Sequence, residues 1–145
     1  AYEPGCGDAR IVIAAVQAGA KLGLGVDINP DLAEVCYARV KAAELEDKIE
    51  IYWGNALDLD MSEVTAVFLF MGNSFNMVMR PMLWEQLPVG ARVVSNDFHM
   101  SDWEPDRTVR VDTPDHTYVL YVWTITAELK EKAEEEVRYA CCVST

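Results

Sequence analysis

Histidines, closely spaced cysteines, long apolar runs and basic residues are all scarce in this 145-residue sequence. It holds two histidines and no Cys-x-x-Cys pair, so a Cys/His zinc cluster has no framework and we expect no metal site. No apolar run reaches the roughly 18 residues of a membrane-spanning helix, and the first residues lack a charged-then-apolar secretory signal. Lys and Arg number 12 against 24 Asp and Glu, a formal net charge of −12. Because such a surface repels phosphate backbones, we expect no nucleic-acid partner.

What is present is the composition of a folded globular domain. Hydrophobic residues make up 51% of the chain and charged residues 25%, enough apolar surface to offset the chain entropy. Its length is that of one domain. The four cysteines are Cys6, Cys36, Cys141 and Cys142, and the adjacent last two make a poor disulfide pair. This pattern is typical of reduced, intracellular thiols, so we expect a cytoplasmic protein. The sequence leaves the oligomeric state open.

Apolar periodicity predicts strands that alternate with helices. We expect strands at residues 1–3, 22–26, 49–53, 64–71, 91–95, 108–112 and 117–126, and helices at 9–18, 31–45 and 76–86, the last interrupted near Arg80-Pro81. The run at 64–71 is apolar throughout, as in a strand buried on both faces of a parallel sheet. The last two strands alternate and flank Pro114-Asp115, as in an antiparallel hairpin. The order predicts an α/β fold, a doubly wound, mostly parallel sheet with an antiparallel edge.

The chain divides into a domain and a charged tail. Residues 1–126 contain all the expected strands, with no repeat or linker. Residues 127–145 contain five glutamates between Glu128 and Glu136 and are expected to form an acidic, solvated helix.

Unusual residues follow four of the expected parallel strands, at the edge where doubly wound sheets bind ligands. The segments are Glu3–Gly7, Asp27–Asn29, Gly54–Ala56 and Met71–Asn73. Gly5 and Gly7 allow a sharp turn and a close approach of the backbone to a ligand. Asp27 lies 20 residues after Gly7, where a carboxylate can accept both hydroxyl groups of a ribose. The combination favours a nucleoside-containing cofactor.

Two residues favour a methyl donor over NAD as that cofactor. A dinucleotide fingerprint needs a third glycine for close packing of the helix on the strand, and Arg10 occupies that position counted from Gly5. Glu3 precedes Gly5 by two residues. Acids near the loop suit S-adenosylmethionine, which carries a sulfonium cation and an amino-acid end rather than a pyrophosphate. An NAD-dependent oxidoreductase is therefore disfavoured.

The segment Glu3-Pro4-Gly5-Cys6-Gly7-Asp8-Ala9 resembles the first motif of class I S-adenosylmethionine-dependent methyltransferases, with Ala9 in place of the usual third glycine. The resemblance implies a Rossmann-like fold. It also implies that Asp27 binds the ribose, that Asn55-Ala56 reads the adenine edge and that Ile28 packs on the adenine face. The cofactor-binding residues expected on this basis are Glu3, Gly5, Cys6, Gly7, Asp27, Ile28, Asn55, Ala56 and Met71.

A narrower resemblance concerns the stretches 76–83 and 90–106. They are similar to a small branch of protein-lysine methyltransferases that includes the mitochondrial enzyme for the ATP synthase c subunit and archaeal and bacterial relatives. This resemblance implies transfer of a methyl group to a protein lysine. A small-molecule methyltransferase and a catalytically silent cofactor-binding module are the alternatives. Only Ala1 and Tyr2 precede Glu3, so we expect an N-terminally truncated first strand and a longer natural protein.

Methyl transfer is an in-line displacement that needs no metal, so alignment is the main task of the enzyme. Asn73, Ser74, Asn96 and Asp97 follow the fourth and fifth strands and are candidates to face the acceptor. Of these we predict Asn73 and Asp97 to be catalytic, with Asp97 guiding a lysine ammonium or taking its proton. The alternative for Asp97 is a turn cap. His99 is either a general base or a solvent-facing loop residue, and we expect Trp103 to be a packing residue.

Overall fold

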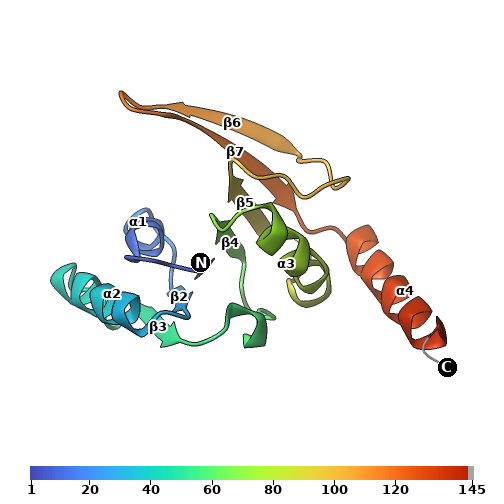
Figure 1. Ribbon diagram of the computed structural model, residues 1–145, viewed down its shortest axis with the longest axis horizontal. Helices are drawn as coiled ribbons and strands as arrows, with labels where there is room; N and C mark the ends of the chain where they lie inside the picture. Colours follow the sequence, from blue (N-terminus) through green and yellow to red (C-terminus); the bar gives the residue numbers. More distant parts are fainter. Residues whose placement is uncertain (144–145) are drawn as a thin grey trace.

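Seven strands form one sheet in the order β3-β2-β1-β4-β5-β7-β6, as the computed structural model shows for residues 1–143 (Figure 1). The strands are β1 (Tyr2–Pro4), β2 (Gly23–Asp27), β3 (Ile49–Trp53), β4 (Ala66–Leu69), β5 (Arg92–Asn96), β6 (Arg107–Asp112) and β7 (Thr117–Thr124). The helices are α1 (Arg10–Gln17), α2 (Pro30–Ala42), the short 3-10 helix η1 (Ala56–Asp58), α3 (Asn73–Gln86) and α4 (Ala127–Val143). Within residues 1–143, none of these helices combines the length and apolar character needed to cross a membrane.

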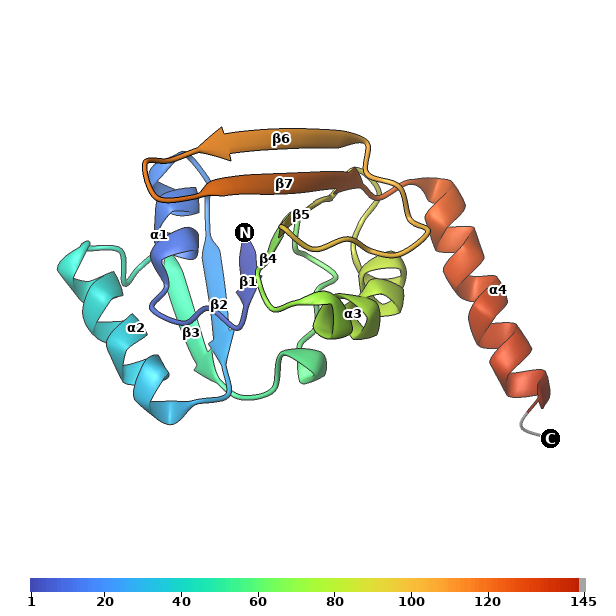
Figure 2. The ribbon, with the colours of Figure 1, turned by 45° about the horizontal axis from the view of Figure 1, so that its top comes forward.

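The first five strands are parallel, and the last two form the antiparallel hairpin that the sequence predicts. β1 pairs in parallel with both β2 and β4, and β7 pairs antiparallel with β5 and with β6. Helices α1 and α2 lie on one face of the sheet and α3 on the other (Figures 1 and 2). The chain therefore reverses its winding between β1 and β4, and a crevice forms at the carboxyl ends of these strands. The predicted fold class is confirmed.

Helix α3 is longer and more regular than predicted. It begins at Asn73 rather than residue 76, because Gly72 turns the chain at φ +106° and the Asn76 N–H reaches the Gly72 carbonyl at 3.1 Å. The helix also continues through Pro81, which has no N–H to donate to the carbonyl one turn earlier. Because Pro81 is exposed, that carbonyl lies on the solvent side of the helix. Buried residues on both sides of the proline hold the helix on the sheet: Met79, Leu83 and Trp84. Packing of the helix on the sheet thus outweighs the interruption that Arg80-Pro81 predicts.

Strand β4 is shorter than the apolar run that predicts it. Only Ala66–Leu69 pair with β5. Val64 lies before the strand, at the end of a turn, and its N–H donates to the Met61 carbonyl at 3.0 Å. Phe70 and Met71 continue beyond the strand and are about half exposed. The end of the run is therefore part of the crevice rather than of the core.

The acidic helix α4 is docked along its first half, which the expectation of a solvated helix did not include. Lys130 Nζ donates to the Glu85 carbonyl at the end of α3 at 2.8 Å, and Ala133 is buried in the main core. From Glu134 to Cys142 every residue is exposed, and the helix points away from the sheet (Figure 2). Residues 144–145 of the expected tail lie outside the described residues.

Replacing Ala133 with aspartate should destabilise the protein by about 2–3 kcal/mol, because the change buries a polar group without a partner. Denaturant unfolding of the two proteins measures this difference. The Glu135→Ala variant is the control on the exposed part of the same helix and should unfold like the unmodified chain. Equal stability of the Ala133→Asp variant would show that α4 is not docked in solution.

Candidate functional site

The loop between β1 and α1 exposes its backbone at the crevice. Gly5 and Gly7 have φ angles of +65° and +54°, in the region that favours glycine. A Cβ atom on Gly5 would lie 2.1 Å from the Met71 sulfur, so this position has room for no side chain while Met71 covers it. The loop therefore presents peptide groups to a ligand, with Met71 from the end of β4 beside it.

Asp27 joins this loop to the end of β2. Its Oδ2 accepts the Gly7 N–H at 3.0 Å, and its Oδ1 accepts the Asn29 N–H at 2.9 Å. The residue is only 8% exposed, so its carboxylate is fixed before any ligand arrives. Each carboxylate oxygen has further acceptor capacity. The arrangement suits the pair of hydroxyl groups of a ribose.

A cavity of about 310 Å³ lies beside Asp27, within the size range of small-molecule sites. It is lined by Gly5, Val26, Asp27, Ile28, Gly54, Asn55, Ala56, Leu57, Met71 and Phe75. Asn55 Oδ1 accepts the Leu57 N–H at 2.9 Å and so fixes the turn that begins η1. Ile28 is 72% exposed and offers an apolar surface. Apolar walls, a fixed carboxylate and a side-chain amide fit an adenosine group.

A second cavity, of about 450 Å³, adjoins the glycine loop. It is lined by Gly5, Cys6, Gly7, Asp8, Arg10, Ile11, Phe70, Asn96 and Tyr118. Tyr118 belongs to the β6–β7 hairpin, which runs past β5 toward α1 (Figure 2). Because both cavities are lined by Gly5, a ligand in one is adjacent to a ligand in the other. The site thus has room for a nucleoside cofactor and for a second molecule.

Eight of the nine predicted cofactor-binding residues line one of these cavities, and Glu3 lines neither. Its Oε2 accepts the Val12 N–H at 3.0 Å, near the start of α1, where Ala9 at the N-cap provides no side-chain acceptor. Burial raises the pKa of Glu3 to about 7, and the negative charges of Asp8 and Asp27 act in the same direction. Glu3 therefore lies outside both cavities, where it stabilises the start of α1.

The two predicted catalytic residues line neither cavity. Asn73 is exposed at the first position of α3. Asp97 exchanges two hydrogen bonds with Val119 of β7, at 2.7 Å through its N–H and at 2.9 Å through Oδ1, and His116 Nε2 lies 3.6 Å from its Oδ2. With φ +62°, Asp97 joins the end of β5 to β7 through these bonds, whereas a turn cap was its predicted alternative. Its catalytic role, like that of Asn73, stays a prediction.

The aromatic residues after β5 are engaged in ring contacts. His99 is exposed and lies on the Tyr121 ring, with centroids 4.0 Å apart. Trp103 lies between Trp84 and Trp123 at centroid distances of 5.5 and 5.3 Å. Trp103 is thus a packing residue, as expected.

Cys36 of α2 supports the glycine loop from beneath. Its Sγ donates to the Gly7 carbonyl at 2.8 Å and lies 3.6 Å from the sulfur of Cys6, which is buried as a small space-filling residue. Burial raises the pKa of the Cys36 thiol, which keeps it protonated as a donor. Among residues 1–143, Cys36 is the one side chain that donates a hydrogen bond to the Gly7 carbonyl.

The Cys36→Ala variant should lose about 1–2 kcal/mol of stability and bind S-adenosylhomocysteine more weakly, because the loop loses its donor and the core a sulfur atom. Cys36→Ser keeps a donor and should retain more of the binding. Calorimetric titration and thermal melts compare the variants. If serine and alanine weaken binding equally, the hydrogen bond to Gly7 does not order the loop.

Sequence reasoning missed several residues that line the cavities: Leu57, Phe70, Phe75 and Tyr118. Phe75 was hidden by the late start predicted for α3, and Phe70 by its place inside a run predicted to be all strand. Tyr118 reaches the site through the hairpin, a long-range pairing that no local pattern reveals.

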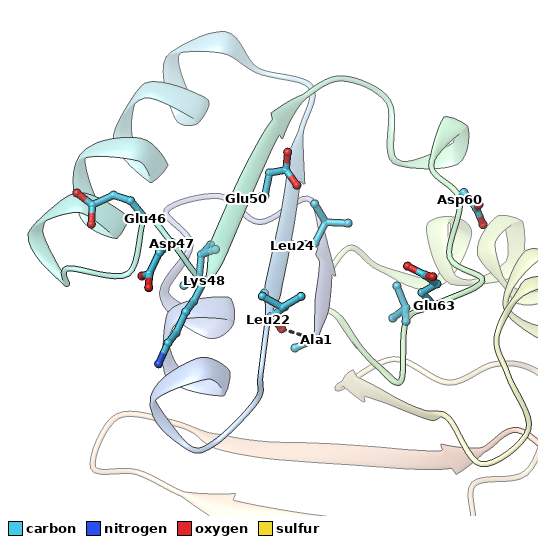
Figure 3. Close-up of a pocket in the computed structure, with 12 residues that line it drawn as sticks. Ala1, Leu22, Leu24, Glu46, Asp47, Lys48, Glu50, Asp60 and Glu63 are labelled. Carbon is cyan, nitrogen blue, oxygen red and sulfur yellow. Dashed lines mark hydrogen bonds between the residues drawn. The ribbon is translucent and has the colours of Figure 1, made fainter.

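Another cavity, of about 520 Å³, lies at the opposite end of the sheet (Figure 3). It is bordered by the starts of β2 and β3, and its charged lining residues are Glu46, Asp47, Lys48, Glu50, Asp60 and Glu63. The amino group of Ala1 donates to the Leu22 carbonyl here at 2.9 Å. Because ligands of such sheets bind at the carboxyl ends, we assign the site to the two cavities beside Gly5.

Comparisons with known proteins agree with this geometry. Residues 3–107 match the family model of the ANTKMT methyltransferase domain. The chain is 32% identical over 125 residues to a protein-lysine N-methyltransferase of Saccharolobus islandicus, covering 86% of this chain and 78% of that protein. It is 31% identical over 101 residues to the adenine nucleotide translocase lysine N-methyltransferase of Mus musculus, covering 70% of this chain and 44% of the mouse protein.

Among solved structures, a similar one is the RNA methyltransferase from Salinibacter ruber in complex with S-adenosyl-L-homocysteine. The identity is 41% and the TM-score 0.79, over 87% of this chain and 80% of that chain. The tRNA methyltransferase TrmK of Bacillus subtilis, at 15% identity and a TM-score of 0.70, shares the fold.

Proposed function

This chain belongs to the ANTKMT methyltransferase family, and we propose that, as an S-adenosylmethionine-dependent methyltransferase, it methylates the side-chain amine of a protein lysine. The observation that carries the proposal is the match, over 86% of this chain, to a protein-lysine N-methyltransferase. The mouse relative is also named for a lysine acceptor. A formal net charge of −12 supports the approach of a lysine-bearing, basic protein.

The chain's own residues bind and align the reactants. S-adenosylmethionine supplies, when bound, a methyl group already activated on a sulfonium, so no metal or covalent intermediate is required. Asp27 would hold the ribose, Ile28 and Phe75 would enclose the adenine, and the glycine loop would place the amino-acid end. Fixed placement of the reacting atoms is the main source of rate in such a reaction.

A lysine must lose its proton before it attacks. The half-exposed Phe70 and the half-buried Tyr118 form an apolar wall of the second cavity, and burial of an amine there lowers its pKa. We retain Asn73 and Asp97 as proposed acceptor-side residues. The Asp97 carboxylate is partly exposed and can attract a lysine ammonium from solution while it holds β7.

Transfer of tritiated methyl groups tests the acceptor class directly. The purified chain and labelled S-adenosylmethionine are incubated in four parallel reactions. Each contains one acceptor source: poly-L-lysine, a desalted protein extract, total tRNA or a metabolite extract. We expect label in the first two, recovered as methyl-lysine after acid hydrolysis. Label in tRNA alone would contradict the lysine proposal and indicate an RNA acceptor. RNA is the competing acceptor because the similar Salinibacter ruber protein is named an RNA methyltransferase. Label in small molecules alone would make this a metabolite methyltransferase.

Two further assignments belong to this proposal. We propose that residues 1–126 form the methyltransferase domain and residues 127–145 an appended acidic tail, since all seven strands lie before residue 126 and α4 begins at Ala127. We also propose a cytoplasmic location. It is supported by the cysteines, because no disulfide joins any of them within the described part of the chain.

A further inference from the structure

One face of the sheet carries an apolar surface over β4, β5, β7 and β6, here called the open face. It lies on the side where α1 and α2 cover β1, β2 and β3 (Figure 1). Its apolar side chains are partly or largely exposed, and none belongs to either apolar cluster of the described residues. They are Phe68, Val94, Val109, Val111, Leu120 and Val122. A contiguous apolar surface of this kind is typical of a site that a partner covers.

The strand register places these side chains together. Val94 of β5 lies opposite Val122 of β7, so both point to the same side. Successive residues of a strand point to opposite faces. The residues that alternate with them are buried in the cluster that includes α3, among them Val67, Val93 and Trp123. Helix α3 therefore packs on one face of these strands, while the apolar side chains of the other face stay outside both clusters in the part of the chain that the structure describes.

The charges on the open face are positive. Arg92 at the start of β5 lies opposite Thr124, and Arg107 at the start of β6 lies opposite Val122, so both arginines share this face. Both are exposed. Among the described strands β4 to β7, no acidic residue has a register position on this face. An apolar surface bordered by arginines fits an acidic, amphipathic segment.

The outer half of α4, residues 134–142, has that character. Steps of four place Leu129, Ala133 and Val137 on one stripe of the helix. Leu129 and Ala133 pack in the main core, whereas Val137 is 52% exposed. At about 100° per residue, Glu134 and Glu136 lie on either side of this stripe. The outer half thus repeats the apolar stripe of the docked half and adds acids beside it.

Helix α4 does not reach the open face of its own chain. Lys130 holds its first half to the end of α3, on the other side of the sheet, and its outer half points away (Figure 2). That half is about 13 Å long. The open face is four strands wide, or about 14 Å, so it has room for the outer half of a helix from another molecule.

We propose that the outer half of α4 from a second copy of this chain docks on the open face. Its apolar stripe covers the exposed valines and leucine, and its glutamates lie beside Arg92 and Arg107. Exchange of helices in both directions gives a closed dimer. Tyr118 shares this face and lines the second cavity, so the docked helix lies beside that cavity. The inference goes beyond the proposed function, because this association requires neither cofactor nor acceptor.

Sedimentation velocity over a range of chain concentrations tests the proposal, and we expect a monomer–dimer equilibrium. Val137→Asp places an unpaired charge in the contact and should raise the Kd of the dimer at least about tenfold. Val111→Asp does the same from the open face, at a residue that is 40% exposed. Val35→Asp, on an exposed position of α2, is the matched control and should leave the Kd unchanged. Thermal melts confirm that each variant is folded.

Two further samples distinguish helix docking from stacking of two open faces. In a mixture of the two aspartate variants, Val137→Asp supplies an intact face and Val111→Asp an intact helix, so the mixture should associate more tightly than either variant alone. The double variant Arg92→Glu/Arg107→Glu should raise the Kd at least about tenfold, because the glutamates of α4 would then meet like charges.

Three results would contradict the proposal. A monomer at every concentration would exclude the association itself. A dimer with the same Kd in Val137→Asp would show that α4 is not in the contact. If Val137→Asp breaks the dimer while Val111→Asp and the double arginine variant do not, α4 binds another surface and the open face is not its docking site.

Discussion

S-adenosylhomocysteine should bind the Asp27→Ala variant at least about 100-fold more weakly than the unmodified chain. Two ribose hydroxyl groups would lose a charged acceptor, and each such hydrogen bond contributes about 1.5–3 kcal/mol. The substitution also removes the acceptor that holds the N–H groups of Gly7 and Asn29, so the loop loses its fixed geometry. Isothermal titration calorimetry at constant salt measures the change.

Two controls accompany this measurement. Asp31→Ala removes the same charge from an exposed position in the first turn of α2 and should leave the affinity within about twofold. Asp27→Asn keeps an acceptor oxygen but loses the charge, so its affinity should lie between those of the unmodified and alanine proteins. Tight binding by a folded Asp27→Ala protein would show that the ribose is not held at the end of β2.

Stability should fall as the pH rises from about 5 to 8, through the ionisation of Glu3. Burial raises the pKa of this residue from 4.5 to about 7, so the folded state binds a proton that the unfolded state has already released. Below pH 4.5 both states are protonated and no difference arises. Between pH 4.5 and 7 the penalty grows, and above pH 7 it is complete, at about 3 kcal/mol.

The Glu3→Gln variant isolates this contribution from the general repulsion among the other acids. A glutamine oxygen can still accept the Val12 N–H, and the side chain does not titrate in this range. The stability difference between variant and unmodified protein, from urea unfolding at several pH values, should grow by about 2.5 kcal/mol from pH 5 to pH 8. Glu134→Gln, at an exposed position of α4, should show no such trend. A constant difference for Glu3→Gln would mean that Glu3 is ionised throughout.

The sequence predicts those site residues whose positions depend only on the local order of strands, loops and helices. Gly5, Gly7 and Asp27 belong to one strand–loop–helix–strand unit, so their spacing determines that they meet. Ile28 and Asn55 follow neighbouring parallel strands and so reach the same edge of the sheet. Positions of this kind require no knowledge of distant pairings.

Other features depend on contacts between distant segments and had no local signal. Glu3 has the residue type of a cofactor ligand, but its burial and its bond to Val12 follow from how α1 packs on β1. Asp97 is held by Val119 through the hairpin, and Ala133 is buried against α3. Residue type predicted cofactor binding for Glu3 and catalysis for Asp97, and charge predicted a solvated helix around Ala133. None of these patterns reports which side chains come together in space, so the observed contacts could not be predicted from them.

The central position of β1 has a consequence for how the chain folds. Tyr2 of β1 pairs with Leu24 of β2 on one side and with Val67 of β4 on the other. During synthesis β2 therefore emerges long before β4. The half built from β1, β2, β3 and their helices can assemble first, with one side of β1 still open. Such an open edge can pair with another nascent chain until β4 emerges and covers it. Pairings this far apart in sequence also slow folding, so β4 determines both how fast the sheet closes and how long its middle stays open to aggregation.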